Sequence, residues 1–159
     1  MKTEEKLKVL KKIAVAFEEK QILWAVGASA LLYFKGMVPD FGDIDIVTTE
    51  EEIPKIIAAL KGIGLLKPEN PANKHKARVY LEYLIDSILV DIMAELIFHK
   101  DNREHRFSLK EEKMTDSIML EGTRIPLQSV QEWRMYYSLM GRTEKVRLID
   151  KNTGRKLYG

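Results

Sequence analysis

Two carboxylates interrupt an apolar run in the first third of the chain, Asp43-Ile44-Asp45-Ile46-Val47. Side chains alternate between the two faces of a strand, so both acids are expected on one face and both isoleucines on the other. At roughly 3.3 Å per residue the two acids lie about 7 Å apart. Their charges then repel by roughly 2 kcal/mol at an effective dielectric of about 20. A divalent cation is the simplest way to offset this repulsion, and we take the pair as the candidate functional centre.

A glycine turn precedes this pair. The segment Gly27-Ala28-Ser29 follows a short apolar run and leads into a predicted helix. Gly27 permits a sharp turn and a close approach of a ligand to the backbone. A helix that begins near Ser29 directs free N–H groups and the positive end of its dipole outward. A phosphate would fit there, with the Ser29 hydroxyl as a further donor.

A third acid, Asp91, interrupts the apolar run 88–93. On a neighbouring strand it would complete a two-metal site or act as the base on an attacking hydroxyl. Glu95 lies on the same face of that predicted strand and is a rival for this role. The competing interpretation of all these acids is an ordinary solvated strand face, in which Asp91 pairs with Arg78.

Several other residues have both a functional and a purely structural interpretation. A basic cluster before a predicted strand is either a solvated loop or a contact to phosphate or RNA in an acceptor substrate. Aromatic side chains at helical spacing in 133–137 are interpreted as core packing, and the cations of 142–147 as solvated. The basic cluster consists of Lys74, His75, Lys76 and Arg78.

Composition narrows the classes of protein further. The chain has 159 residues, which fits one domain, and no cysteine, which excludes disulfides, thiolate zinc sites and a cysteine nucleophile. Its net charge of +2, from 26 basic and 24 acidic side chains, does not by itself predict a nucleic-acid-binding protein. No signal peptide and no run of about 20 apolar residues is recognisable, so a cytoplasmic protein without a membrane span is expected.

Periodicity and turn signals predict an α+β (α/β) fold, with a mixed β-sheet and flanking helices. Ser129 with Glu132, and Thr49 with Glu52, have the spacing of capping boxes, and Thr143 is a candidate cap of the last helix. Segments 67–74 and 99–106 are expected to be irregular. The predicted core spans about 20–127 and the C-terminal helices about 129–150. Helices are expected at 4–19, 30–34, 49–60, 129–141 and 143–149, and strands at 22–26, 44–48, 78–84, 88–93, 117–120 and 124–127.

In this order, the motifs resemble the signature of the nucleotidyltransferase superfamily, which has the DNA-polymerase-beta-like fold. The signature is a glycine–serine turn, an Asp-hydrophobic-Asp strand after one short helix, and a later single Asp in a strand. Here it is matched by 27–29, 43–45 and Asp91, and the resemblance covers roughly residues 20–150. The chain departs from the pattern at Ala28, where glycine is common, and just before Asp43, where many relatives have arginine or threonine.

The resemblance implies a metal-dependent transfer of NMP from an NTP, with ATP the first candidate, to a hydroxyl acceptor with release of pyrophosphate. The acceptor stays open between a small hydroxyl compound, an RNA end and a protein side chain, and a homo-oligomer also stays open. Asp91 would orient or deprotonate the acceptor hydroxyl. The residues implied to hold Mg²⁺ or Mn²⁺ are Asp43, Asp45 and Asp91. Those implied to contact the nucleotide are Gly27, Ala28, Ser29 and Lys35.

Two alternatives remain at this point. The chain could retain the fold as a non-catalytic interaction module, for example one half of a toxin–antitoxin pair. Its short length, which leaves little chain for an acceptor pocket, and the departure at Ala28 motivate this hypothesis. The other alternative is an unrelated α+β domain whose acids only face water.

Overall fold

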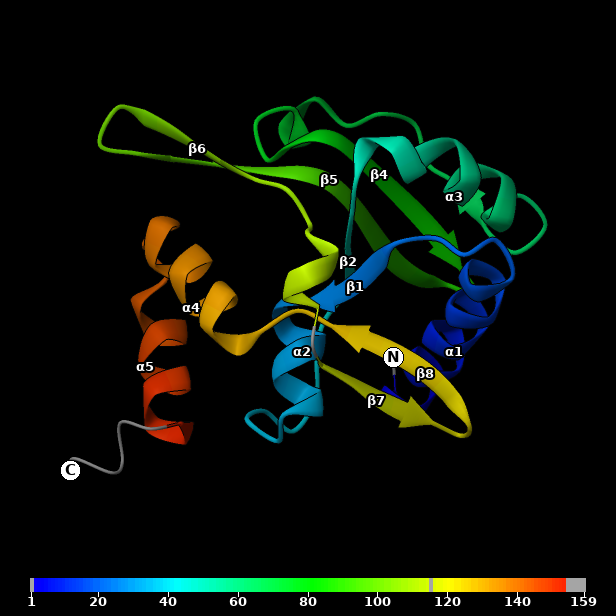
Figure 1. Ribbon diagram of the computed structural model, residues 1–159, viewed down its shortest axis with the longest axis horizontal. Coiled ribbons are helices and arrows are strands. Elements are labelled where there is room, and N and C mark those ends of the chain that lie inside the picture. Colours follow the sequence, from blue (N-terminus) through cyan, green and yellow to red (C-terminus); the bar gives the residue numbers. More distant parts are fainter. Residues whose placement is uncertain (1, 115, 154–159) are drawn as a thin grey trace.

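The computed structural model describes residues 2–114 and 116–153. Its strands form one mixed sheet with the order β3-β4-β5-β2-β1-β8-β7, and β6 extends it by pairing with β5 (Figure 1). The helices are α1 (Thr3–Glu19), α2 (Ala28–Phe34), α3 (Ile53–Leu60), α4 (Val130–Leu139) and α5 (Thr143–Asn152). The strands are β1 (Trp24–Gly27), β2 (Ile44–Thr48), β3 (Leu65–Leu66), β4 (Ala77–Ile85), β5 (Ile88–Lys100), β6 (Arg103–Phe107), β7 (Asp116–Leu120) and β8 (Thr123–Leu127).

This arrangement confirms the α+β class predicted from the sequence. At the centre of the sheet β2 runs parallel to β5 and antiparallel to β1, and β1 runs parallel to β8. The remaining neighbours are antiparallel pairs, among them the hairpins β4–β5, β5–β6 and β7–β8. Within the described residues, no helix combines the length and the apolar character needed to cross a bilayer.

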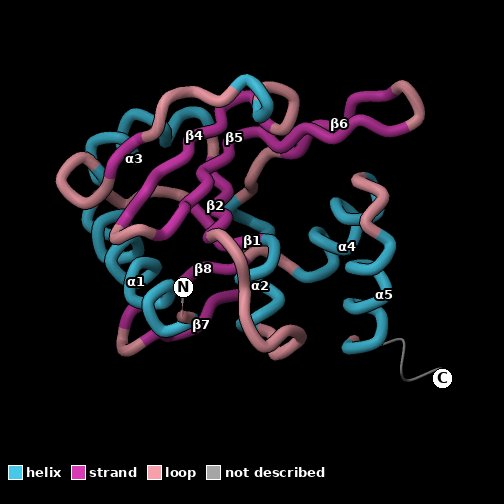
Figure 2. The backbone as a smooth tube through the Cα atoms, turned by 180° about the vertical axis from the view of Figure 1, so that it is seen from behind, coloured by secondary structure: helices cyan, strands magenta, loops and turns pink. Residues whose placement is uncertain are grey.

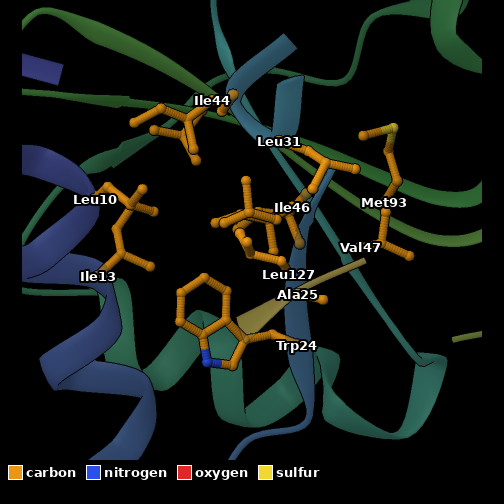
Figure 3. Close-up of a cluster of buried hydrophobic side chains, with 14 of the residues drawn as sticks. Leu10, Ile13, Trp24, Ala25, Leu31, Ile44, Ile46, Val47, Met93 and Leu127 are labelled. Atoms are coloured by element: carbon orange, nitrogen blue, oxygen red, sulfur yellow. The ribbon is translucent and has the colours of Figure 1, made fainter. Parts of the chain in front are cut away.

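One layer of the hydrophobic core lies against the face of β2 that carries Ile44 and Ile46. Ile44 and Ile46 are completely buried, as the alternation in β2 predicts. Figure 3 shows the α1 side chains Leu10 and Ile13 pointing toward these two isoleucines. Since the isoleucines occupy the core face, the acids between and beside them are left on the opposite face of the sheet.

The C-terminal helices stand beside the sheet as a separate pair, below the long β5–β6 hairpin (Figures 1 and 2). Aromatic contacts fasten the hairpin to α4: Phe98 of β5 stacks on Tyr136 with ring centroids 5.1 Å apart, and Phe107 of β6 also lies 5.1 Å from Tyr136. The Lys100 ammonium donates to the Ser138 carbonyl oxygen at 3.4 Å. Hairpin and helices therefore form the two walls of a cleft, described below.

The prediction that 99–106 is irregular is wrong. β5 continues through Lys100, and the chain turns at Asp101 and Asn102, whose φ angles are +53° and +61°. Two consecutive positive φ angles are typical of the tight type I′ hairpin turn. The hairpin escaped prediction because its end projects from the sheet and exposes polar side chains on both faces, so no apolar alternation marks it.

One of the two predicted capping boxes forms. Ser129 Oγ accepts from the Glu132 amide at 3.0 Å, and the Glu132 carboxylate accepts from the Ser129 amide at 3.3 Å. The box predicted at Thr49 and Glu52 does not form, because the Glu52 carboxylate accepts instead from the Leu23 amide at 2.6 Å. The proposed cap at 143 is also wrong, since that residue is the first of α5 and the N-cap position is 142. The short strand β3 was not predicted.

Candidate functional site

Strand register brings two of the predicted acids side by side. Asp45 of β2 pairs directly with Asp91 of β5, although 45 residues separate them in the chain. On the outer sides, Gly27 of β1 pairs with Asp45, and Glu82 of β4 pairs with Asp91. Paired residues share a face, and neighbouring strands lie about 4.8 Å apart. Asp45, Asp91 and Glu82 therefore form a carboxylate row across three strands, with the glycine turn at its end.

The electrostatics of the row disfavour its ionised form. Asp91 is only 8% exposed, and burial raises its pKa to about 6, although a hydrogen bond with the Tyr80 hydroxyl acts in the opposite direction. Burial also raises the pKa of Asp45 well above its usual range, and the charges of Asp91 and Asp43 raise it further. Lys76 is the cation that lowers both pKa values. The row therefore favours protonated carboxyl groups unless further positive charge is bound beside it.

Asp43 lies just before β2 and is exposed, and the loop before it is firmly held. Lys6 of α1 is 9% exposed; its ammonium donates to the Phe41 carbonyl oxygen and lies 3.4 Å from the Asp40 carboxylate. Asp40 also accepts from the Thr3 hydroxyl at 2.6 Å and from the Phe41 amide, and these hydrogen bonds lower its pKa. The loop that delivers Asp43 is therefore tied to the first helix.

Contacts within the protein fix the backbone conformation of the glycine turn. A Cβ atom on Gly27 would lie 2.5 Å from Trp133 Nε1 and 2.7 Å from Gln128 Oε1, so only glycine fits under these side chains. Trp133 Nε1 donates to Gln128 Oε1 at 2.7 Å. The next residue, Ala28, has a φ of +53°, which strains any residue with a Cβ. Ser29 follows in α2, and its hydroxyl accepts from the Gly42 amide at 3.2 Å.

A cavity of about 870 Å³ connects these parts, and sites for small ligands are typically of this size. Its floor is partly apolar, with Met93 and Leu96 of β5. Its lining also includes the turn 28–29, Asp45, side chains of α4 such as Trp133 and Tyr137, and the cations Arg142 and Lys145 at the start of α5. The charged and polar side chains in its lining include Ser29, Asp45, Lys76, Tyr80, Arg142 and Lys145.

Two of the predicted candidates lie elsewhere. Lys35 follows α2 at the end remote from the turn and forms an ion pair with Asp116 of β7. The structure therefore does not bring it to the carboxylate row. Glu95, the rival third acid, has a φ of +61°, and the Ser108 hydroxyl lies 2.6 Å from each of its carboxylate oxygens. The pairing of Arg78 with Asp91, which would have left the acid a structural role, is absent, because Arg78 pairs with Glu50 at 2.7 Å.

Three residues of β4 and the loop before it were not recognised as site residues. Tyr80 hydrogen-bonds Asp91, and burial raises the pKa of the phenol above its usual value. Glu82 extends the carboxylate row, and Lys76 lies over the Tyr80 ring with its ammonium 5.8 Å from the centroid. Lys76 was considered only as part of the basic cluster. The signal that could have identified Glu82 is an acid in a mostly apolar strand, the same signal that identified Asp91.

The carboxylate row offers oxygen donors, the kind of ligand that hard divalent cations bind. Carboxylates on neighbouring strands, with raised pKa values and one cation near them, have the oxygen ligands that Mg²⁺ and Mn²⁺ prefer. In the described ranges, however, no three acidic or histidine side chains are already close enough together to hold a metal ion.

Comparisons with known proteins find similarity among solved structures. No family model and no curated protein sequence matches the chain. Among solved structures, a proposed nucleotidyltransferase from Thermotoga maritima superposes with a TM-score of 0.72 at 24% identity, covering 95% of this chain and 94% of that one.

Two antibiotic-modifying proteins superpose as well. ANT(2″)-Ia in complex with adenylyl-2″-tobramycin has a TM-score of 0.63 at 14% identity, over 94% of this chain and 90% of that one. The lincosamide antibiotic adenylyltransferase LnuA, bound to lincomycin, has a TM-score of 0.60 at 14% identity, over 92% and 97%. The likeness extends over nearly the whole chain, and this protein has the nucleotidyltransferase fold.

Proposed function

We propose that this protein is a metal-dependent nucleotidyltransferase, which transfers NMP from an NTP to a hydroxyl group with release of pyrophosphate. The observation that carries the proposal is the direct pairing of Asp45 with Asp91 beside the turn 27–29, with Asp45 and the turn residues 28–29 in the lining of a cavity of about 870 Å³. A solvated strand face would not bury one of these acids or raise the pKa of both.

In this proposal Asp43, Asp45 and Asp91 hold Mg²⁺ or Mn²⁺, which when bound neutralises charge on the phosphates. The turn residues contribute the phosphate contacts, through the backbone of 27–28 and the Ser29 hydroxyl. Lys76, whose charge already acts on both paired acids, is better placed than Lys35 to add positive charge. Catalysis then depends on positioning and charge neutralisation, as in phosphoryl transfer generally.

Asp91 is the candidate for the residue that orients or deprotonates the acceptor hydroxyl. Without a bound cation, burial raises the pKa of Asp91 to about 6, and a cation held by the same carboxylate would lower this pKa, so a metal-holding Asp91 fits the orienting role better than the role of base. The Tyr80 hydroxyl hydrogen-bonds this carboxylate and so fixes its orientation. ATP is the first nucleotide to test, because the named neighbours include an adenylyltransferase and a complex with an adenylylated antibiotic.

Calorimetric titration with ATP and Mg²⁺ tests the proposal. We expect the wild type to bind, and the double variant Asp43→Asn with Asp45→Asn to lose most of its affinity. The matched control is Asp86→Asn with Asp101→Asn, at two hairpin turns where φ is positive and asparagine is as well tolerated as aspartate. Equal affinity of the wild type and the first double variant would reject the metal-holding role of the acids.

One of the two arguments for a non-catalytic interaction module, as in a toxin–antitoxin pair, is weakened by the structure. It was motivated by a chain too short for an acceptor pocket. This chain nevertheless contains a cavity of about 870 Å³, and it covers 97% of LnuA, which is bound to lincomycin. Short length is therefore no argument against an acceptor site in this fold.

A further inference from the structure

The turn 27–29, which is proposed to hold the phosphates, packs directly against a tryptophan of α4. Gly27 has a φ of −128° and a ψ of −167°, an extended conformation that residues other than glycine also adopt. A Cβ atom at this position would nevertheless lie 2.5 Å from Trp133 Nε1 and 2.6 Å from Trp133 Cζ2. The close approach of the indole ring, and not the backbone conformation, is therefore what restricts this position to glycine.

The indole ring is held in place by a buried hydrogen bond. Trp133 Nε1 donates to Gln128 Oε1 at 2.7 Å, and both side chains are buried. The backbone amide of Gln128 donates to the Val26 carbonyl oxygen at 3.0 Å, one residue before Gly27. The residue that accepts from the indole is thus bonded to the end of β1 itself. The ring therefore has a fixed position relative to the turn.

Contacts on the other side of α4 extend to the β5–β6 hairpin. Trp133 lies edge to face with Tyr136, with ring centroids 5.1 Å apart, and the Gln128 side chain hydrogen-bonds the Tyr136 hydroxyl. Tyr136 in turn contacts Phe98 and Phe107 of the hairpin. The tryptophan is consequently supported from behind, and it cannot move away from the turn without disturbing these contacts.

The turn needs such support because its second residue is strained. Ala28 has a φ of +53°, which is unfavourable for any residue with a Cβ atom. Strained backbone of this kind persists only where the surrounding structure fixes it. Ala28, Ser29 and Trp133 all line the same cavity, so the ring supports the turn at the place where the phosphates are proposed to bind.

Resting on the proposed function, we infer that Trp133 is a positioning residue for the phosphate contacts of the turn. It acts through the backbone of Gly27 and Ala28 and does not itself need to contact the nucleotide. Without the indole ring the strained turn relaxes, and the terminal phosphates of an NTP lose their directed contacts. The base, the ribose and the α-phosphate keep theirs. The expected signature is a loss of affinity for a nucleoside triphosphate that the monophosphate does not share.

Calorimetric titration with ATP and Mg²⁺, with AMP added as a competitor in a second series, tests this inference. The variant Trp133→Phe keeps an aromatic ring but removes the Nε1 donor and the part of the indole nearest to Gly27. A misplacement of about 1 Å can cost about 10²-fold in rate, and we expect the affinity for ATP to fall at least about tenfold. The affinity for AMP should change by less than about twofold.

The other tryptophan of the chain provides the matched control. Trp24 is 5% exposed, against 4% for Trp133, and it packs edge to face on Phe17 in the core (Figure 3). Trp24→Phe is the same chemical change at the same depth of burial, but on the side of β1 that faces α1. We expect it to lower the melting temperature and to change the affinity for either nucleotide by less than about twofold.

A second variant, Gly27→Ala, alters the same contact from the backbone and does not depend on how well Trp133→Phe folds. The backbone conformation allows alanine, but the added methyl group must displace the indole ring or the turn. We expect a selective loss of affinity for ATP here as well. In the double variant the two losses should combine to less than their product, because both act on one contact. Losses that multiply would overturn the inference.

The outcomes separate this inference from the proposed function. If the wild type binds ATP with Mg²⁺ and the two turn variants lose affinity for ATP selectively, both proposals stand. If the wild type binds ATP but Trp133→Phe weakens ATP and AMP by the same factor, or no more than Trp24→Phe does, the inference fails and the proposed function stands. If the wild type binds no NTP, the proposed function fails, and the positioning role fails with it.

Discussion

The two faces of β2 differ as much as any two regions of this molecule. On one face Ile44 and Ile46 are completely buried against the core. On the other, one residue away, Asp45 pairs with Asp91, and burial together with the charges of nearby carboxylates raises the pKa values of both. A single strand thus combines a well-packed apolar surface with an unfavourable accumulation of charge. The first surface stabilises the fold, and the second is the surface at which we propose that a metal ion and a nucleotide bind.

The two faces of β2 are expected to contribute to different properties, one to stability and the other to the proposed activity. A substitution on the core face should reduce the free energy of unfolding and change activity only through folding. A substitution on the acidic face should abolish activity and leave the stability of the ligand-free protein unchanged or increased. Neighbouring residues of one strand are therefore expected to respond in opposite ways, which tests the assignment of the faces directly.

Asp45→Asn should have the largest effect. We expect nucleotide transfer to fall by about 10³-fold, since an essential charge in a preorganised site is lost. The melting temperature in metal-free buffer should stay the same or rise, because the repulsion with Asp91 and Asp43 is removed. Steady-state kinetics measures the loss of activity, and thermal melting measures the change in stability. A variant that loses both activity and stability would place Asp45 among the structural residues.

Ile46→Ala should have the opposite profile. The side chain is completely buried, so its truncation should reduce the free energy of unfolding by about 2–5 kcal/mol. Chemical denaturation measures this loss. At a temperature where the variant is folded, its affinity for ATP with Mg²⁺ should match that of the wild type. A marked loss of affinity in the folded variant would show that the two faces are not independent.

Stability of the metal-free protein should depend on pH in an unusual direction. The pKa of Asp91 is raised to about 6 in the folded state, from about 3.8 in the unfolded chain. Between these values the folded state binds more protons, so stability decreases as the pH rises from about 4 to about 6, by about 3 kcal/mol for this group alone. Denaturation in the presence of a chelator measures the change. Asp91→Asn should flatten the profile, and a rise in stability over this range would contradict the assignment.

Ala28→Gly should have the smallest effect. The φ of +53° strains alanine but not glycine, and relief of this strain is worth about 1 kcal/mol. Part of the gain is offset, because glycine loses more backbone entropy on folding. A small rise in melting temperature is therefore expected, together with retained affinity for ATP. A large fall in stability would indicate that the methyl group of Ala28 makes an essential contact.

The comparison also explains what could be predicted from the sequence. The alternation of acids and isoleucines around Asp45 is a local pattern, and the bounds predicted for β2 agree with the structure. The turn at 27–29 and the capping box at Ser129 are local signals as well, and the nucleotidyltransferase fold predicted from their order is confirmed. Chemical type and spacing are sufficient where neighbours in the chain determine the structure.

Features that depend on residues far apart in the chain could not be predicted from local sequence patterns. The pairing of Asp45 with Asp91 follows from the register of two parallel strands that are joined by a long crossover. Glu82 enters the row only because β4 continues that register. Glu52 has the spacing of a capping residue, but its carboxylate accepts instead from the amide of Leu23, just before β1. Lys35 is close to the motif in sequence, yet the direction of α2 takes it away from the acids.

The buried Lys6 has a consequence for work on this protein. Together with Thr3 it holds the loop that delivers Asp43, and both residues lie in the first two turns of α1. We therefore expect a purification tag or a deletion at the start of the chain to disturb the loop that carries Asp43. Recombinant versions that differ only at this end should be compared before an inactive preparation is ascribed to the wrong substrate.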